Sequence, residues 1–273
     1  MRRMRVLVLM HKDLVPPEQL NGQDLDTAAW KTEYDVVSTL RKLGHDVQAL
    51  GVKSDLEVIR AAVEDWKPHI AFNLLEEFDG VAVYDQNVVS YLELMRIPYT
   101  GCNPRGLMLA RDKALAKQVM SYHRIPYPEF MVVPLHRMVR RPKYLPFPLI
   151  VKSITEEASL GISQASIVDD DEKLRERVAF IHDNVGTGAL VERYIEGREL
   201  YVGVMGNAHL QVFPVWELVM DKMPDESRRI ATQRVKWSRK YQDKYGIRSC
   251  EARNLPDGVI DHIQHLATRV YRA

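Results

Sequence analysis

The sequence predicts an α/β protein with an N-terminal open parallel sheet followed by an α+β domain. Short apolar runs alternate with helical patterns through about residue 103, which favours a parallel sheet. Beyond that point strand-like segments follow one another more closely, which is typical of an α+β domain. The chain has 273 residues, 46% of them hydrophobic, so it can bury a core in two or three compact units.

The N-terminal elements are expected in the order β-α-β-α-β-α-β. The expected strands are 6–10, 47–50, 70–75 and 98–101, and the expected helices are 34–43, one opened by residues 54–57, and 85–95. Residues 6–10 are continuously apolar, as in a parallel strand covered on both faces. Gly44 is placed to cap the first helix, and Ser54-Asp55-Leu56-Glu57 has the form of a capping box for the second.

In the second part a helix is expected over 111–122 and another over 257–273. The expected strands are 130–133, 149–153, 162–168, 189–192, 200–205 and 209–215, with Gly206-Asn207 as a tight hairpin turn. The last helix carries Ile260, Ile263, Leu266, Ala267 and Val270 on one face. Because the sequence shows no cap, no stop signal and no strand for that face to pack against, we expect a missing C-terminal piece.

Charge and cysteine content exclude several classes of protein. The formal net charge is +1, so no overall field favours nucleic acid or an anionic membrane. Cys102 and Cys250 are too few for a disulfide scaffold, which favours a reducing, cytoplasmic location. The basic start and the apolar run 6–10 resemble a signal peptide, but the run is too short.

The first strand-to-helix junction argues against a dinucleotide-binding fold. Such a site needs glycines there, so that a pyrophosphate can approach the helix N-terminus. Residues 11–17 read His-Lys-Asp-Leu-Val-Pro-Pro, and neither G-x-G-x-x-G nor G-x-x-x-x-G-K-S/T occurs in the chain. A nucleotide site in this chain would therefore need a different binding motif.

Two lysines in the middle of the chain are candidates for phosphate contacts. Lys113 opens a helix, and Lys152 ends the apolar strand 149–151. Burying an unpaired ammonium group costs several kcal/mol, so Lys152 is better explained if it meets a phosphate. The polar loop 153–161 could fold over that phosphate through its backbone N–H groups. Alternatively, each lysine extends outward to solvent from its strand or helix.

The segment 190–200 combines an apolar strand, a short hinge with an aromatic residue, and then Gly197 and Glu199. A flat adenine needs an apolar slot with one donor and one acceptor, which a hinge backbone can supply. A carboxylate further along could accept the ribose hydroxyls. The alternative is an ordinary β-hairpin with charged surface side chains.

In order along the chain, these segments resemble the nucleotide site of ATP-grasp enzymes, and more closely the D-alanine–D-alanine ligases. The segments that carry the resemblance are 91–101 (YLELMRIPYTG), Asp112-Lys113, 148–152 (PLIVK) with 159–161 (SLG), and 190–199 (LVERYIEGRE). The resemblance covers most of the chain from about residue 70. It implies a pre-ATP-grasp domain over 1–104, a central ATP-grasp subdomain over 105–190 and an incomplete C-terminal subdomain over 191–273.

The resemblance also implies roles for individual residues. The implied ATP-binding residues are Lys113 and Lys152 at the α- and β-phosphates, Ser159 and Gly161 in the phosphate loop, Glu192, Arg193, Tyr194 and Ile195 around adenine, and Glu199 at the ribose. Lys236 falls where the family has a catalytic lysine near the γ-phosphate, although it could be a surface lysine. Glu33 is the nearest counterpart of a substrate-orienting glutamate, but a carboxylate in a first helical turn is also simply favourable.

The chemistry implied by the family is ligation of a carboxylate to an amine through an acylphosphate. ATP and Mg²⁺ would be the cofactors, with the magnesium ligands expected beyond residue 273 and no metal ligand in this chain. The implied substrates are an amino acid or other carboxylate and an amine, in a possible homodimer. The 273-residue chain itself is expected to be inactive.

Two alternatives remain open at the level of sequence. The chain could be a non-catalytic nucleotide-binding relative, or a nucleic-acid-associated protein that uses the basic segment 222–248. In that segment the spacing of Trp237, Tyr241 and Tyr245 favours a packed face instead.

Overall fold

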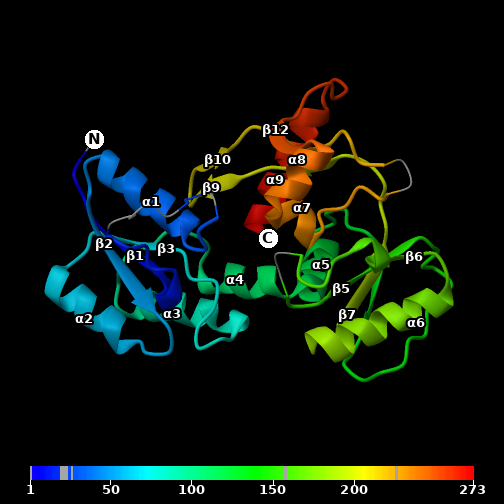
Figure 1. Cartoon of the computed structure of the whole chain (residues 1–273), viewed down its shortest axis with the longest axis horizontal. Helices are drawn as coiled ribbons and strands as arrows, with labels where there is room; N and C mark the ends of the chain where they lie inside the picture. Colours follow the sequence, from blue (N-terminus) through cyan, green and yellow to red (C-terminus); the bar gives the residue numbers. More distant parts are fainter. Residues whose placement is uncertain (1, 19–23, 26, 157–158, 225–226) are drawn as a thin grey trace. The chain divides into compact units, whose positions relative to one another are not determined.

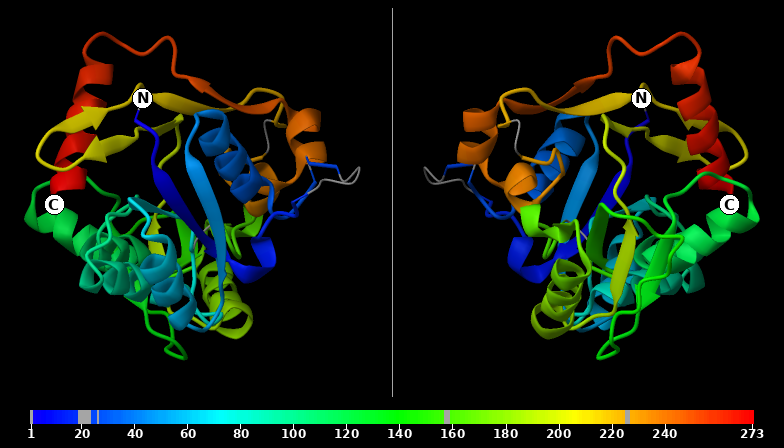
Figure 2. Two further views of the ribbon diagram at one scale, coloured as in Figure 1. Left: turned by 90° about the vertical axis from the view of Figure 1, so that its left-hand side faces the viewer. Right: turned by 90° about the vertical axis from the view of Figure 1, so that its right-hand side faces the viewer.

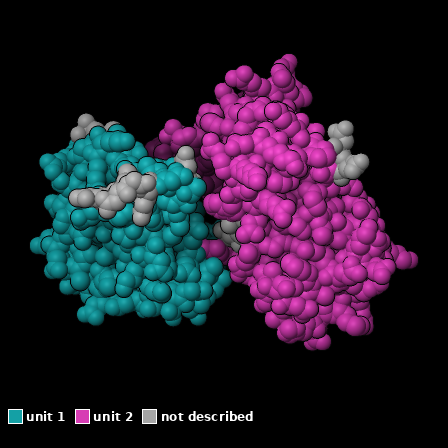
Figure 3. All heavy atoms as spheres, viewed as in Figure 1, with its two compact units in different colours: residues 1–110 teal, residues 111–273 magenta. Residues whose placement is uncertain are grey.

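The computed structural model describes residues 2–18, 24–25, 27–156, 159–224 and 227–273 (Figure 1). The chain divides into two compact units, Met1–Ala110 and Arg111–Ala273 (Figure 3). The first domain was expected to end at residue 104, and this division lies after Ala110. No helix in the described part of the chain is both long enough and apolar enough to cross a membrane.

The first unit contains the expected parallel sheet. Its strands are β1 (Arg5–His11), β2 (Asp46–Val52) and β3 (Ile70–Asn73), in the order β2-β1-β3. A single parallel bridge between Ala71 and Tyr99 represents the fourth expected strand. Five consecutive apolar residues of β1 are buried, because helices cover both faces of this central strand.

Alternate side chains of β1 enter two separate cores. Leu7 and Leu9 pack with the helices α2 (Glu57–Trp66) and α3 (Asp85–Leu94) on one face. Val6, Val8 and Met10 pack with α1 (Lys31–Lys42) on the other face. The short helix α4 (Pro104–Arg111) and the 3-10 turns η1 (Lys12–Leu14) and η2 (Ala82–Tyr84) complete the elements that begin in this unit.

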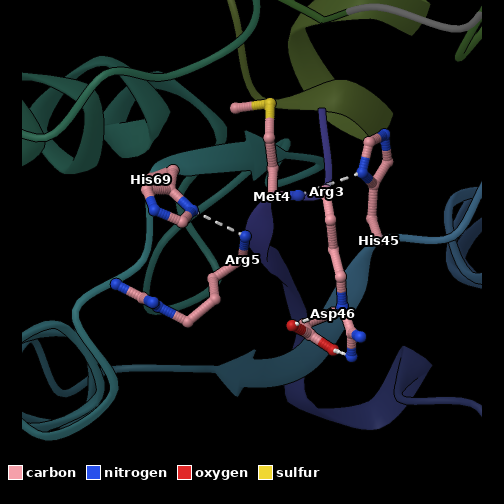
Figure 4. A network of polar contacts seen from close by, with 6 residues as sticks. All are labelled: Arg3, Met4, Arg5, His45, Asp46 and His69. Carbon is pink, nitrogen blue, oxygen red and sulfur yellow. Dashed lines mark hydrogen bonds and ion pairs between the residues drawn. The ribbon is translucent and has the colours of Figure 1, made fainter. Parts of the chain in front are cut away.

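Two imidazoles fix the start of β1 against its neighbours (Figure 4). The Met4 N–H donates to Nδ1 of His45 at 3.3 Å, and the Arg5 N–H donates to Nδ1 of His69 at 2.8 Å. Arg3 adds an ion pair with Asp46. Residues that precede β2 and β3 thus satisfy backbone donors that the sheet itself leaves unpaired.

The predicted capping box at the start of α2 is wrong. The N-cap position is Leu56, which makes no side-chain cap hydrogen bond. Asp55 does that work instead, because its Oδ1 accepts from the Glu57 N–H at 2.8 Å. The N-cap therefore lies two residues later than the Ser54 pattern indicated.

The second unit is built on a four-stranded antiparallel sheet. Its strands are β4 (Phe130–Val133), β7 (Ala189–Arg193), β5 (Leu149–Ser153) and β6 (Ile167–Val168), in the order β4-β7-β5-β6. Helix α6 (Asp171–Phe180) and the π-helical turn Ile181–Val185 pack on one face through a core of buried aliphatic side chains. Because side chains alternate along a strand, every second side chain of these strands points to the opposite face of the sheet, away from this core.

One expectation around this sheet is confirmed and another is corrected. The helix expected near 111–122 is α5 (Lys113–Tyr122), which Lys113 opens as predicted, and a separate helix α4 ends at Arg111. Asp112 caps α5 by accepting from the backbone N–H groups of Ala114 and Leu115. The strand expected over 162–168 is a 3-10 turn at Gln164–Ser166 followed by the two residues of β6.

A second antiparallel sheet has the order β12-β11-β8. It joins β8 (Glu199–Tyr201), β11 (Trp216–Met220) and β12 (Ile247–Glu251). Neither β11 nor β12 was predicted from the sequence. Helices α7 (Gln233–Trp237) and α8 (Arg239–Tyr245) lie between β11 and β12 in the chain.

The basic segment 222–248 is distributed over α7, α8 and β12. Tyr241 and Tyr245 have ring centroids 4.6 Å apart and belong to the core around Met220. Trp237 is 69% exposed, so the expected packed face holds for the two tyrosines and is wrong for the tryptophan. Some of the positive charges are paired, as in the ion pair of Arg248 with Asp221.

The last helix has a strand partner, contrary to expectation. Helix α9 (Val259–Arg272) lies beside the hairpin of β9 (Val204–Gly206) and β10 (Leu210–Val212) (Figures 1 and 2). The Tyr271 hydroxyl donates to the Gly206 carbonyl at 2.8 Å. Cover of the apolar face is partial, because Ile260 and Val270 remain 43% and 47% exposed.

Gly206 is required by the geometry of this hairpin. Its φ is +129°, and a Cβ atom there would lie 2.1 Å from the His209 carbonyl oxygen. Any other residue would therefore force the backbone of the turn to move. The predicted hairpin is confirmed, but its loop is 207–209, and Gly206 is the last residue of β9 and pairs with Leu210.

Candidate functional site

The second unit contains a cavity of about 630 Å³ on the face of the four-stranded sheet opposite α6. Residues singled out from the sequence that line it are Lys113, Lys152, Ser159, Glu192, Arg193, Tyr194, Ile195, Glu199 and Lys236. Gly161 is not a lining residue, although its neighbours Leu160 and Ile162 are. Glu33 belongs to the first unit. The structure thus brings all the predicted site residues except Gly161 and Glu33 together around one cavity.

Strand alternation explains why β5 carries both core and cavity side chains. Leu149 and Val151 belong to the core under α6, whereas Ile150 and Lys152 line the cavity. In the register of β5 with β7, Ile150 lies opposite Glu192. Glu192 is therefore placed on the same face as Lys152 by the pairing of the two strands.

Glu192 lies between two ammonium groups. It forms a short ion pair with Lys152 through Oε1, and Nζ of Lys117 lies 2.8 Å from Oε2, as an ion pair without hydrogen-bond alignment. Burial by itself would raise the pKa of Glu192, which is only 5% exposed. The two lysines more than offset this effect, so the pKa of Glu192 lies below its ordinary value.

Lys113 reaches the cavity from the first turn of α5. Its Nζ donates to the Glu156 carbonyl at 2.6 Å, and the Ile154 carbonyl lies 3.4 Å away. The backbone N–H of Lys113 also donates to the Ile154 carbonyl. The lysine is thus fastened to the segment that follows β5.

The loop after β5 is held from two sides. The Ser159 hydroxyl donates to the Ala231 carbonyl at 2.5 Å. The Gly161 carbonyl accepts from the buried guanidinium of Arg177, which stacks 4.2 Å from the Phe180 ring. Ser159 and Gly161 both have positive φ, at 65° and 71°. Residues 157 and 158 of the expected loop lie outside the described residues.

One part of the cavity wall is apolar. Ile150, Ile162 and Ile230 pack together with Tyr194, and all four line the cavity. The Arg228 guanidinium carbon lies 5.8 Å from the Tyr194 ring centroid. Burial and the nearby charge of Glu196 raise the pKa of the Tyr194 hydroxyl. This wall could accept a flat, apolar ring.

The backbone at the end of β7 departs from the sheet at this apolar wall. The Tyr194 N–H donates to the Pro148 carbonyl at 3.0 Å, and the Arg193 N–H donates to the Glu129 carbonyl at 2.9 Å. The next backbone donor, the Ile195 N–H, has no hydrogen-bond partner among the described residues. A ligand in the cavity could therefore use the Ile195 N–H.

Glu199 and Arg198 lie at the start of β8, on the next part of the wall. Glu199 accepts a hydrogen bond from the Tyr201 hydroxyl, and this bond together with burial raises the pKa of Tyr201. Arg198 forms a two-pronged ion pair with Glu217, with N–O distances of 2.7 and 2.6 Å. Arg198 is thus held by the second sheet, whereas the hydrogen bond of Glu199 with Tyr201 uses its Oε1 oxygen.

Some lining residues were missed from the sequence. Glu156, Arg198 and Arg229 line the cavity. Lys117 does not line it but forms an ion pair with the lining residue Glu192. A signal for Lys117 was present, because it follows Lys113 by four residues and so shares its helix face. Nothing in the local sequence indicated Arg229.

Glu33 has a different environment in the first unit. It lies in the first turn of α1 and is 6% exposed. Burial, together with the nearby charge of Glu76, raises the pKa of Glu33. Its Oε2 has no hydrogen-bond partner among the described residues.

The residues present do not fit a magnesium site. The carboxylates among the cavity-lining residues are Glu156, Glu192 and Glu199, and Glu192 is already paired with two lysines. Across the part of the chain that the structure describes, no three His, Cys, Asp or Glu side chains form a group that could hold a metal ion. No magnesium ligand is therefore assigned among the described residues.

Comparison with solved structures identifies the fold. The chain is similar to the crystal structure of D-alanine–D-alanine ligase from Bacillus anthracis complexed with ATP, with a TM-score of 0.69 and 18% identity over 98% of this chain and 77% of that chain. VanG D-Ala:D-Ser ligase from Enterococcus faecalis is similar with a TM-score of 0.63 and 18% identity, over 99% and 82%. The expected parallel sheet followed by an ATP-grasp fold is confirmed.

Sequence comparison identifies the family. An uncharacterized protein of Sinorhizobium fredii is 31% identical over 189 residues, which cover 67% of this chain and 54% of that protein. D-alanine–D-alanine ligase of Gluconobacter oxydans is 28% identical over 239 residues, which cover 86% and 71%. The chain thus spans about half the length of the first relative.

A family model described as the D-ala D-ala ligase C-terminus matches residues 119–273. This range includes β4 to α9, and with them most of the residues that line the cavity. The match extends over more than half of the chain and agrees with the fold found above. The chain belongs to the D-alanine–D-alanine ligase family of ATP-grasp proteins.

Proposed function

We propose that the cavity of the second unit binds ATP and serves an ATP-dependent carboxylate–amine ligase. The observation that carries this proposal is the meeting of Lys113, Lys152 and Lys236 with the segment 192–199 in one cavity. Positive charge at one part of the wall and an apolar surface at another match the two ends of a nucleotide. Family membership supports the same assignment.

The phosphates would occupy the part of the cavity lined by Lys113, Lys152 and Ser159. Lys152 has a 30% exposed side chain, so its ammonium is accessible to a ligand while it still contacts Glu192. Lys236 lines the same cavity from α7 and would meet the terminal phosphate. Each charge-assisted contact contributes roughly 1.5–3 kcal/mol.

Adenine would lie against Tyr194 and the isoleucines of the apolar wall. The Ile195 N–H would donate to a ring nitrogen, and Glu199 would accept from the ribose hydroxyls. The Glu192 carboxylate is occupied by two lysines, so any contact with the adenine amino group would be shared with them. We therefore assign Glu192 mainly to holding charge.

In the proposed reaction a substrate carboxylate oxygen attacks the γ-phosphorus of ATP. The bond from that phosphorus to the β,γ-bridging oxygen breaks, which gives ADP and an acylphosphate. An amine then attacks the acyl carbon, loses a proton and expels phosphate. The lysines of the cavity would neutralise the charge that moves onto the phosphate oxygens. The amino-acid substrates and a cytoplasmic location are part of the same proposal.

Lys152→Met should weaken ATP binding by about tenfold or more, because it removes one charge-assisted phosphate contact. Equilibrium titration with ATP measures the effect. Lys240→Met is the matched control, since Lys240 is an exposed lysine on α8 and does not line the cavity. Equal losses in the two variants would overturn the assignment of the phosphate site.

A second candidate is ATP binding without ligation, which the absence of a metal-type group among the described residues favours. If this second candidate holds, residues 1–273 bind ATP but release no ADP with amino acids, because no group of described residues would hold a metal ion that aligns the reacting groups. An ADP-release assay with candidate amino acids and amines measures this. Turnover on the usual scale of about 1–100 per second would establish ligation instead.

A further inference from the structure

The three charged side chains of the cluster formed by Glu192, Lys117 and Lys152 are unequally buried. The Glu192 side chain is 6% exposed and that of Lys117 is 11% exposed, whereas that of Lys152 is 30% exposed. Lys152 lines the cavity, and Lys117 is not among the residues that line it. The Glu192 carboxylate therefore has one cation in the cavity lining, Lys152, and one more deeply buried cation outside the lining, Lys117.

Lys117 is fixed in the protein interior. It is on α5, where its Nζ lies 2.8 Å from Glu192 Oε2 and 5.8 Å from the Phe130 ring centroid. Phe130 is opposite Glu192 in the register of β4 with β7. Helix α5 and strand β4 thus hold Lys117 against the carboxylate at a position outside the cavity lining.

A buried carboxylate without a cation is costly, because its charge loses hydration and gains nothing in return. If Lys152 were its sole partner, a phosphate that attracted Lys152 would have to leave Glu192 unpaired. With Lys117 in place, Glu192 keeps one counter-ion when the other moves. The pair that remains is neutral, and the Lys152 charge is free for the ligand.

We propose that Lys117 is a positioning residue, which acts as the permanent counter-ion of Glu192 and so lets Lys152 turn from Glu192 to a nucleotide phosphate. This inference rests on the proposed function of the cavity as an ATP site. It assigns no ligand contact to Lys117. Its effect on ATP passes through Glu192 and Lys152.

A double-mutant cycle between Lys117 and Glu192 tests this role. In Lys117→Met the remaining lysine is held by the carboxylate, so we expect ATP and ADP binding to weaken by about tenfold, a factor equal to about 1.4 kcal/mol. Adenosine binding should change by less than about twofold, because adenosine has no phosphate. In the Glu192→Gln background Lys117→Met should change ATP binding by less than about twofold, because no buried negative charge is left to satisfy.

Two further variants separate this role from a loss of structure. Lys117→Arg keeps the counter-ion and should retain most of the ATP affinity. The double variant lacks both charges, so it should fold even if Lys117→Met does not. Thermal unfolding of each variant shows which ones are folded.

The outcomes distinguish the inference from the proposal beneath it. Wild-type protein that does not bind ATP, or an unaltered affinity in Lys152→Met, would overturn the proposed function. If Lys152→Met loses affinity but Lys117→Met does not, only the counter-ion role fails. It also fails if Lys117→Met weakens adenosine as much as ATP, or weakens ATP equally in the Glu192→Gln background.

Discussion

Two glutamates of this chain are equally buried but differ in charge environment. Glu33 of the first unit and Glu192 of the second unit are 6% and 5% exposed. The pKa of Glu33 is raised, by burial and by the charge of Glu76, whereas the pKa of Glu192 is lowered because two lysines outweigh burial. Burial therefore does not decide the ionisation of a carboxylate here; its neighbours do.

The difference has a structural origin. Glu192 is on a strand whose register brings Lys152 beside it, and α5 adds Lys117 from behind. Glu33 is in a first helical turn, where the helix dipole favours its negative charge but no lysine or arginine is paired with it among the described residues. The same chain thus holds Glu192, whose environment favours the carboxylate anion, and Glu33, whose environment favours the neutral carboxylic acid.

Glu192→Ala should give the largest effect, a loss of about 3–5 kcal/mol in the free energy of unfolding at pH 7. The substitution leaves the ammonium groups of Lys117 and Lys152 close together without a counter-ion. Urea denaturation measures it. Glu176→Ala, at an exposed position of α6, is the control and should lie within about 0.5 kcal/mol of wild type. A similar small loss in both variants would show that the buried triad contributes little.

Glu33→Gln should have a smaller effect of opposite sign. Glutamine occupies nearly the same volume and removes the cost of ionising a buried group, so the free energy of unfolding at pH 7 should rise. The same urea measurement applies. A loss of stability would mean that the Glu33 anion has a favourable partner, and the contrast with Glu192 would disappear.

The change of the free energy of unfolding with pH should be the smallest of these effects. It should have opposite signs for Glu192 and Glu33. The lowered pKa of Glu192 gives stability that is present above its ordinary value of 4.5 and is lost as the pH falls through the folded-state pKa. The raised pKa of Glu33 gives stability that is present below 4.5 and is lost as the pH rises through its folded-state pKa.

The gain in Glu33→Gln should therefore vanish in acid, whereas Lys117→Met should become more like wild type there. Stability measured for each variant between about pH 3 and pH 8 separates the two cases. Parallel curves for both variants would contradict the opposite pKa shifts.

Sequence patterns predicted the elements that bury a regular face. The apolar run of β1 and the helical spacing of apolar residues in α1 both result from burial, and such spacing is visible in the sequence itself. Strands β11 and β12 were missed because they are largely half-exposed and carry charged residues such as Glu217 and Arg248. β11 pairs with β12 and with β8, and no local sequence pattern shows these pairings.

The same limit applies to the candidate site. Lys152 could be predicted because an ammonium at the end of an apolar strand needs a local explanation. Lys117 could not be paired with Glu192 in advance, because the contact depends on how α5 packs against β7. The burial of Glu33 likewise depends on the packing of the whole first unit.

The imidazoles at the start of β1 have a chemical consequence. His45 and His69 each accept a backbone N–H at Nδ1, so that nitrogen must carry a lone pair and the proton of the neutral ring must reside on Nε2. Each ring is thereby confined to one tautomer by the main chain of its neighbour. An asparagine, whose amide oxygen is an acceptor at a similar distance from Cα, could substitute at either position; a lysine, which is a donor alone, could not.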